Sequence, residues 1–229
     1  IIYKAKMRRR TKIVATISDQ RCEVEFIQQL YEAGMNVARI NSAHVSVESA
    51  TRVVENIRKV SDKIAILIDT KGPEIRTTKT KDKGGIPVEA CDLIEVKGGE
   101  ATDLTTRETL YVTDKNIAKE VPVGASVLID DGDIELEIVE KKKDVLIARV
   151  KNKGVIKSSK SVNVPNVSIS LPSITQRDEM FIRWAIEMEL DFIAHSFVRR
   201  KEDVLAVQKI IDEHNSPIKI ISKIENQEG

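Results

Sequence analysis

Residues 36–69 read NVARINSAHVSVESATRVVENIRKVSDKIAILID, and this stretch decides the fold. Its two ends, NVARIN and IAILID, are short runs rich in isoleucine and valine, which is typical of buried strands. Between these runs, apolar residues recur at helical spacing from Val53 to Val60. A strand, a helix and a second strand in this order predict two parallel strands joined by a helical crossover.

The same alternation continues on both sides of this stretch. Residues 11–17 (TKIVATI) predict a strand, and residues 24–33 predict a helix that ends at Gly34. Later in the chain the sequence predicts a helix, a strand, a helix and a strand at 174–188, 191–197, 202–214 and 218–225. Five such strands predict part of a (β/α)₈ TIM barrel within an α/β fold. Because an open half-barrel leaves unpaired strand edges, we expect this sequence to be part of a longer chain.

The pattern changes between residues 77 and 160. Turns rich in glycine and lysine separate short alternating strands, which we place at 93–96, 126–129, 134–139 and 145–150. These predict a small antiparallel, all-β barrel domain inserted after the third strand. The expected organisation is therefore 1–76 for the first part of the barrel domain, 77–160 for the inserted domain and 161–229 for the second part.

The composition excludes several classes of protein. Lys and Arg number 37 against 36 Asp and Glu, so no bulk charge attracts nucleic acid or an acidic membrane. Two distant cysteines, Cys22 and Cys91, indicate neither a disulfide framework nor a zinc cluster, and a reducing, cytoplasmic location is expected. No apolar run approaches the roughly 18 to 20 residues of a membrane span.

Charged and polar residues gather where the predicted strands end. Arg39 and Asn41 end the second strand, Asp69 ends the third, and Lys223 and Glu225 end the fifth. Active sites of parallel barrels form at the carboxyl ends of the strands. Cations that neutralise phosphate, beside oxygen ligands for metal ions, favour phosphoryl transfer. Structural ion pairs that close the barrel rim are the alternative for any one of these residues, but five together favour a site.

Several segments resemble the pyruvate kinase family in family order and spacing across residues 11–229. The most specific are IDTKGPEIRT at 68–77 and ISKIEN at 221–226, and KSVNVPN at 160–166 and SFVRRKEDV at 196–204 add to them. The resemblance implies transfer of the phosphoryl group of phosphoenolpyruvate to ADP in glycolysis, giving pyruvate and ATP. It also implies that the inserted domain is a lid and that the complete protein is a homotetramer.

The resemblance implies a role for each residue of the site. Arg39 would bind the phosphoryl group of phosphoenolpyruvate, and Lys223 would stabilise its charge during transfer. Glu225 would bind Mg²⁺ together with a second carboxylate beyond residue 229. The remaining roles are Asn41, Asp69 and the Thr70 carbonyl for K⁺, and Arg76, Lys160, His44 and Asn41 for the nucleotide.

The chain departs from the family pattern at several positions, including Ala43 and His195. Family members usually have N-F-S-H where this chain has Asn41-Ser42-Ala43-His44, so Ala43 removes a hydroxyl expected at K⁺. K⁺ dependence is still expected, with water or Ser42 in place of that hydroxyl. The second departure is His195, where a small or apolar residue is more usual. A core histidine and a pocket role both remain open for it.

Three other functions compete with this interpretation. Another barrel enzyme acting on phosphoenolpyruvate or pyruvate, such as an aldolase or lyase, would also need Mg²⁺, but it gives no reason for a lid. An oligonucleotide-binding module would use aromatic stacking platforms, whereas Tyr111 is the single aromatic residue in 77–160. A structural fragment without turnover is the third, and residues 1–229 alone are expected to lack kinase activity.

Overall fold

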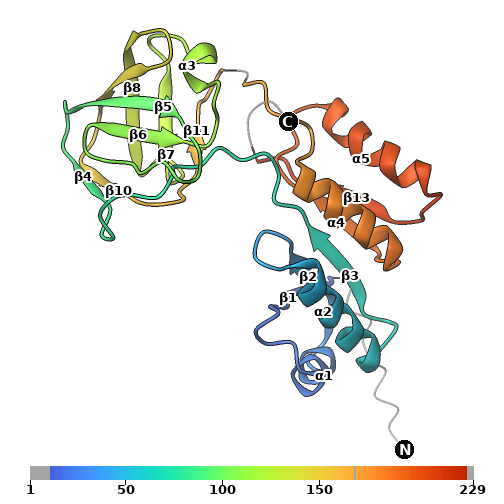
Figure 1. Ribbon diagram of the computed structural model, residues 1–229. Coiled ribbons are helices and arrows are strands. Elements are labelled where there is room, and N and C mark those ends of the chain that lie inside the picture. The colour runs from blue at the N-terminus through green and yellow to red at the C-terminus, as the bar shows by residue number, and fades with distance from the viewer. Residues whose placement is uncertain (1–10, 168, 226–229) are drawn as a thin grey trace, which may run out of the picture. The chain divides into compact units, whose positions relative to one another are not determined.

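The computed structural model describes residues 11–167 and 169–225, and the chain divides into two compact units (Figure 1). The first unit contains the described residues up to Pro73 and from Pro172 onward. The second unit is the intervening segment, Glu74–Leu171. In the described part of the chain, no helix is both long enough and apolar enough to cross a membrane.

Helices alternate with parallel strands throughout the first unit. Its elements are β1 (Ile13–Thr16), α1 (Val24–Glu32), β2 (Met35–Asn41), α2 (Val47–Val60), β3 (Ala65–Asp69), α4 (Gln176–Glu187), β12 (Phe192–His195), α5 (Lys201–Glu213) and β13 (Lys219–Ser222). The strands form one parallel sheet in the order β1-β2-β3-β12-β13. This order confirms the predicted α/β sheet of a partial barrel, because each strand lies beside the next strand of the same sheet.

The register aligns the carboxyl ends of the strands. Asp69 pairs with Asn41 of β2 on one side and with Ala194 of β12 on the other. Side chains alternate between the two faces of the sheet, so Ile40 and Ile68 pack into the core beneath the helices. Arg39, Asn41 and Asp69 have the opposite parity and lie on the other face.

The first turns of two helices are fixed by reciprocal capping. At α2 the Ser46 hydroxyl accepts from Ser49 N, and the Ser49 hydroxyl accepts from Ser46 N. Thr175 and Asp178 form the same arrangement at α4. Such caps satisfy backbone groups that the helix itself leaves unpaired, so each helix begins at a defined residue beside the sheet.

The second unit is built almost entirely from strands. Its elements are β4 (Ile86–Val88), β5 (Leu93–Gly98), β6 (Thr109–Val112), α3 (Ile117–Glu120), β7 (Ser126–Ile129), β8 (Ile134–Lys141), β9 (Leu146–Val150), β10 (Gly154–Ile156) and β11 (Val162–Asn163). Six of them form a sheet in the order β11-β7-β8-β9-β5-β6, and β10 pairs with β4. The inserted β domain is therefore present, with its own apolar core.

One pairing in this domain differs from the antiparallel arrangement expected from the sequence. Strands β5 and β6 run parallel, with Val96 opposite Leu110, while the other pairs of the six-stranded sheet are antiparallel. The connection from Gly99 to Glu108 is long enough to return beside β5 before β6 begins. Turn-rich composition indicates where strands end, but it does not specify the direction in which the next strand runs.

Candidate active site

Asp69 lies at the centre of a cluster of charges at the carboxyl edge of the parallel sheet. Its side chain is only 4% exposed. Its Oδ2 atom accepts from Arg39, at 2.7 Å from Nε and 2.6 Å from Nη2. Its Oδ1 atom accepts from Lys223 Nζ at 3.0 Å. Two predicted site residues from distant parts of the sequence therefore meet on one buried carboxylate.

This cluster extends to the first strand of the sheet. Arg39 Nη1 donates to the hydroxyl of Thr16, the last residue of β1, at 2.8 Å. Arg39 and Lys223 keep 32% and 31% of their side chains exposed, so both cations remain open to solvent while their carboxylate partner is buried. A buried carboxylate needs such charge-assisted hydrogen bonds to offset its desolvation. The arrangement presents two positive groups, held in place, to a ligand at this edge.

Among the residues that the structure describes, Lys223 has three acceptors. Besides Asp69, its Nζ atom lies 2.8 Å from the Ser196 hydroxyl and 3.3 Å from Glu225 Oε1. Ser196 was not among the residues predicted from the sequence. The signal that could have identified it is the one used for the others: it is a polar residue directly after a strand of the sheet, β12.

Glu225, which the sequence predicts as a Mg²⁺ ligand, lies beside Lys223. Its side chain is 41% exposed, and Oε2 accepts from the backbone N–H of Phe197 at 2.9 Å. Phe197 adopts a left-handed conformation with φ of +60°, which directs this N–H toward Glu225. A hard carboxylate oxygen at the sheet edge suits Mg²⁺. Within residues 11–167 and 169–225, no group of three or more His, Cys, Asp or Glu side chains could hold a metal ion alone.

The oxygen atoms expected to hold K⁺ lie close to the same edge. The Asn41 side-chain oxygen accepts from Ala43 N at 3.0 Å, and the Thr70 carbonyl accepts from the Ser196 hydroxyl at 2.6 Å. An amide oxygen, a carboxylate and a carbonyl suit a hard cation. Ser42, which follows β2, is fully buried, and its hydroxyl has no hydrogen-bond partner among the described residues.

Two adjacent residues of α4 hold the loops that follow β2 and β3. Arg177 Nη2 donates to the carbonyls of Ser42 and Val45, at 2.5 and 2.6 Å. Asp178 Oδ1 accepts from the backbone N–H groups of Lys71 and Gly72, at 3.0 and 3.3 Å. The first turn of α4 therefore fixes the backbone around both predicted K⁺-binding segments, although sequence reasoning treated this helix only as part of the scaffold.

His195 lies outside this cluster, because its side chain is fully buried on the opposite side of β12 from Ser196. Neither ring nitrogen makes a hydrogen bond of ordinary geometry with any described residue. Burial lowers the pKa of His195, and the nearby Asp178 and Asp203 offset this effect only in part. The position favours a core histidine over a pocket role.

We expect His195 to make the protein less stable in mild acid. Its pKa is lower in the folded protein than its ordinary value of 6.5, so the unfolded chain binds protons more readily. Stability is therefore lost as pH falls below about 6.5. Thermal unfolding between pH 7.5 and 5.5 should show a larger fall in Tm for the wild type than for His195→Leu. Equal falls in the two proteins would contradict this expectation.

The predicted nucleotide-binding residues are divided between the two units. His44 is an exposed residue of the first unit, between β2 and α2. Arg76 and Lys160 belong to the second unit, where each is paired with an acid. Arg76 Nε lies 2.7 Å from Glu74 Oε2, and Lys160 Nζ lies 2.9 Å from Asp130 Oδ1.

Asp130 belongs to the turn Asp130-Asp131-Gly132. All three residues have positive φ, and the turn joins β7 to β8 as an ordinary hairpin connection. Ser161 also holds this turn, because its carbonyl accepts from Asp130 N at 2.9 Å and its hydroxyl donates to Asp131 Oδ1 at 3.0 Å. Lys160 and its neighbour therefore anchor this turn.

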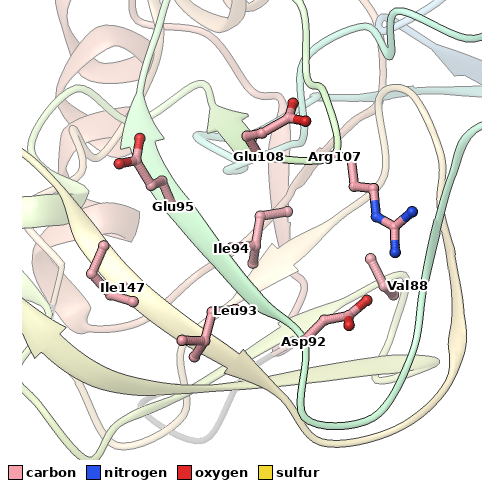
Figure 2. Close-up of a pocket in the computed structure, with 8 residues that line it drawn as sticks. All are labelled: Val88, Asp92, Leu93, Ile94, Glu95, Arg107, Glu108 and Ile147. Atoms are coloured by element: carbon pink, nitrogen blue, oxygen red, sulfur yellow. The ribbon is translucent and has the colours of Figure 1, made fainter.

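A hollow of the second unit differs from the charged cluster in its chemistry. Figure 2 shows its lining, in which one guanidinium, Arg107, is accompanied by the carboxylates of Asp92, Glu95 and Glu108. The hollow measures about 370 Å³. Three negative groups against one positive group disfavour a phosphate ligand. We therefore do not assign the nucleotide to this hollow.

Comparison with known proteins identifies the family. Residues 8–229 match the family model described as the barrel domain of pyruvate kinase. The pyruvate kinase of Borreliella burgdorferi is 49% identical over 220 residues, which cover 96% of this chain and 45% of that protein. Those of Bacillus licheniformis and Geobacillus stearothermophilus are 45% and 43% identical, over 96% and 97% of this chain and 38% and 39% of their own lengths.

The chain thus spans about two fifths of the length of these curated relatives. The family match covers both parts of the parallel sheet and the β domain between them. It also includes every residue of the cluster around Asp69. This chain belongs to the pyruvate kinase family.

Proposed function

We propose that the complete protein containing this chain transfers the phosphoryl group of phosphoenolpyruvate to ADP, forming pyruvate and ATP in glycolysis. The observation that carries the proposal is the pairing of Arg39 and Lys223 on one buried carboxylate, Asp69. Two cations fixed side by side suit a phosphoryl group, whose charge must be neutralised in the ground state and in transfer. Family membership supports the same reaction.

Each cation of the cluster has a separate task in this proposal. Arg39 binds the phosphoryl group of phosphoenolpyruvate through its planar guanidinium, which Asp69 and Thr16 orient. Lys223 stabilises the charge on that group as its bond to the enolpyruvate oxygen breaks and its bond to the ADP oxygen forms. The phosphoryl group thus passes from one oxygen to the other beside two positive charges that need no rearrangement.

We propose two metal ions as cofactors. Mg²⁺ would be held by Glu225 and by a carboxylate beyond residue 229, and it would supply further charge neutralisation at the phosphoryl oxygens. K⁺ would be held by Asn41, Asp69 and the Thr70 carbonyl. Ala43 supplies no hydroxyl, so water or Ser42 would complete the K⁺ coordination.

The remaining assignments concern the nucleotide and the assembly. We propose that Arg76, Lys160, His44 and Asn41 bind the nucleotide phosphates, and that the second unit acts as a lid that excludes water during transfer. Arg76 and Lys160 support this role because 38% and 35% of their side chains are exposed. The complete protein is proposed to be a cytoplasmic homotetramer.

A coupled assay of pyruvate formation tests the proposed function. The complete protein should form pyruvate from phosphoenolpyruvate only with ADP and Mg²⁺ present, and replacing Na⁺ by K⁺ should raise the rate. Residues 1–229 alone should show no turnover, because the second Mg²⁺ carboxylate and three barrel strands are expected beyond residue 229. An inactive complete protein would refute the proposed function. An equal rate in Na⁺ and K⁺ would refute K⁺ dependence alone.

A further inference from the structure

Ser196 joins the parts of the charged cluster through one hydroxyl group. Its Oγ atom lies 2.8 Å from Lys223 Nζ, 3.0 Å from Asp69 Oδ1 and 2.6 Å from the Thr70 carbonyl oxygen. The residue is 3% exposed, so water does not compete freely for these contacts. A serine hydroxyl has one proton to donate and lone pairs with which to accept. It therefore accepts from the Lys223 ammonium while donating to one of the two oxygens.

The backbone around Ser196 is held on both sides. Ser196 N donates to the Thr70 hydroxyl at 3.0 Å. On the other strand, Lys223 N donates to His195 O at 2.9 Å, and Val198 N donates to Lys223 O at 3.1 Å. These bonds place Ser196 directly beside the lysine from which the ammonium extends. The Ser196 hydroxyl therefore has a fixed position from which to restrain that ammonium.

Gly72 allows the close approach of the two chain segments at this point. Its φ is +74°, and a Cβ atom there would lie 3.1 Å from Ser196 O and 3.2 Å from Ser196 Cβ. Glycine adopts this backbone conformation without a steric cost, and it leaves room for the segment that carries Ser196. Glycine at position 72, shortly after β3, therefore leaves space for Ser196, which follows β12.

The neutral hydroxyl suits a lysine that must keep its charge. Lys223 is anchored by Asp69, but Arg39 shares that carboxylate through its other oxygen. A further carboxylate in place of Ser196 would neutralise the ammonium and weaken its attraction for a phosphoryl group. A hydroxyl restrains the position of Nζ and leaves its positive charge available.

We propose that Ser196 is a positioning residue for the phosphoryl-transfer reaction, which orients the Lys223 ammonium and couples it to Asp69 and the Thr70 carbonyl. This inference rests on the proposed function of the complete protein. It also concerns a residue that acts through Lys223 and does not itself touch the substrate. Losing the Ser196 hydroxyl is therefore expected to lower mainly kcat, because a displaced ammonium would no longer stabilise the charge that develops during transfer.

The test compares Ser196→Ala with Ser61→Ala in the complete protein. Ser61 lies between α2 and the first residue of β3, at the opposite end of that strand from Asp69, and its hydroxyl accepts from Lys63 N at 3.1 Å. Loss of one hydrogen bond to a charged group should lower kcat of Ser196→Ala about 10- to 100-fold. Its KM for phosphoenolpyruvate should change less than about threefold, because Arg39 is untouched. Ser61→Ala should keep kcat within about twofold of the wild type.

A second variant separates positioning from folding. Ser196→Cys nearly retains the volume of the side chain, but a thiol is a weak hydrogen-bond partner. It should remain folded at the assay temperature, as a thermal unfolding transition will show, and still lose kcat about as strongly as Ser196→Ala. A kcat within twofold of the wild type in either folded Ser196 variant would overturn the positioning role, as would an equal loss in Ser61→Ala. Each of these outcomes is compatible with the proposed function, whereas an inactive wild-type protein would refute both the proposed function and the role of Ser196.

Discussion

Lys223→Met is expected to abolish turnover of the complete protein while it still binds phosphoenolpyruvate. Methionine retains the length of the side chain but removes the ammonium that contacts Asp69, Ser196 and Glu225. Because that charge acts mainly on the transferring group, kcat should fall at least about 10³-fold, which corresponds to about 4 kcal/mol of transition-state stabilisation. Substrate binding should remain because Arg39 is unchanged.

Steady-state kinetics and calorimetric titration with phosphoenolpyruvate and Mg²⁺ would measure the two effects separately. Lys219→Met is the matched control, since Lys219 is exposed at the opposite end of β13. It should retain the wild-type kcat. Normal turnover in Lys223→Met would refute the assignment of Lys223, whatever the result for the control.

Asp69→Asn should lower kcat/KM by at least about 100-fold. The carboxylate binds Arg39 through Oδ2 and Lys223 through Oδ1, whereas an asparagine offers one oxygen and must point its NH₂ group toward the other cation. Breaking a buried charge pair in this way costs about 3 kcal/mol or more. Activation by K⁺ should weaken as well, because an oxygen proposed to bind K⁺ is lost.

The measurements for this variant are kcat/KM for phosphoenolpyruvate and the rate in K⁺ relative to Na⁺. Asp62→Asn provides a control, since Asp62 is an exposed residue that precedes β3 at the opposite end of the strand. It should behave like the wild type. If Asp69→Asn kept kcat/KM within threefold, the carboxylate would not organise the site.

The strands of the first unit could be predicted from the sequence because each is a short apolar run between helical patterns. Their polar ends then placed Arg39, Asp69 and Lys223 on one edge, since parallel strands share the direction in which they end. Contacts that depend on tertiary packing could not be predicted in this way. Arg177 illustrates this, because its partners are carbonyl groups of Ser42 and Val45, more than 130 positions away in the sequence.

Other features were missed because residue type alone leaves the geometry open. Ser196 is a common residue whose importance appears only when Lys223 and Thr70 are seen on either side of it. The parallel pairing of β5 with β6 is set by the path of a loop and not by the alternation within either strand.

The central claim is that Arg39 and Lys223, organised by Asp69, together bind the phosphoryl group of phosphoenolpyruvate. A crystal structure of the complete protein with Mg²⁺, K⁺ and a saturated, unreactive analogue of phosphoenolpyruvate tests it most directly. Oxygens of the analogue's phosphoryl group should lie within hydrogen-bond distance, about 3 Å, of both the Arg39 guanidinium and Lys223 Nζ. A phosphoryl group bound elsewhere, with both side chains still engaged only by Asp69 and its neighbours, would contradict the claim.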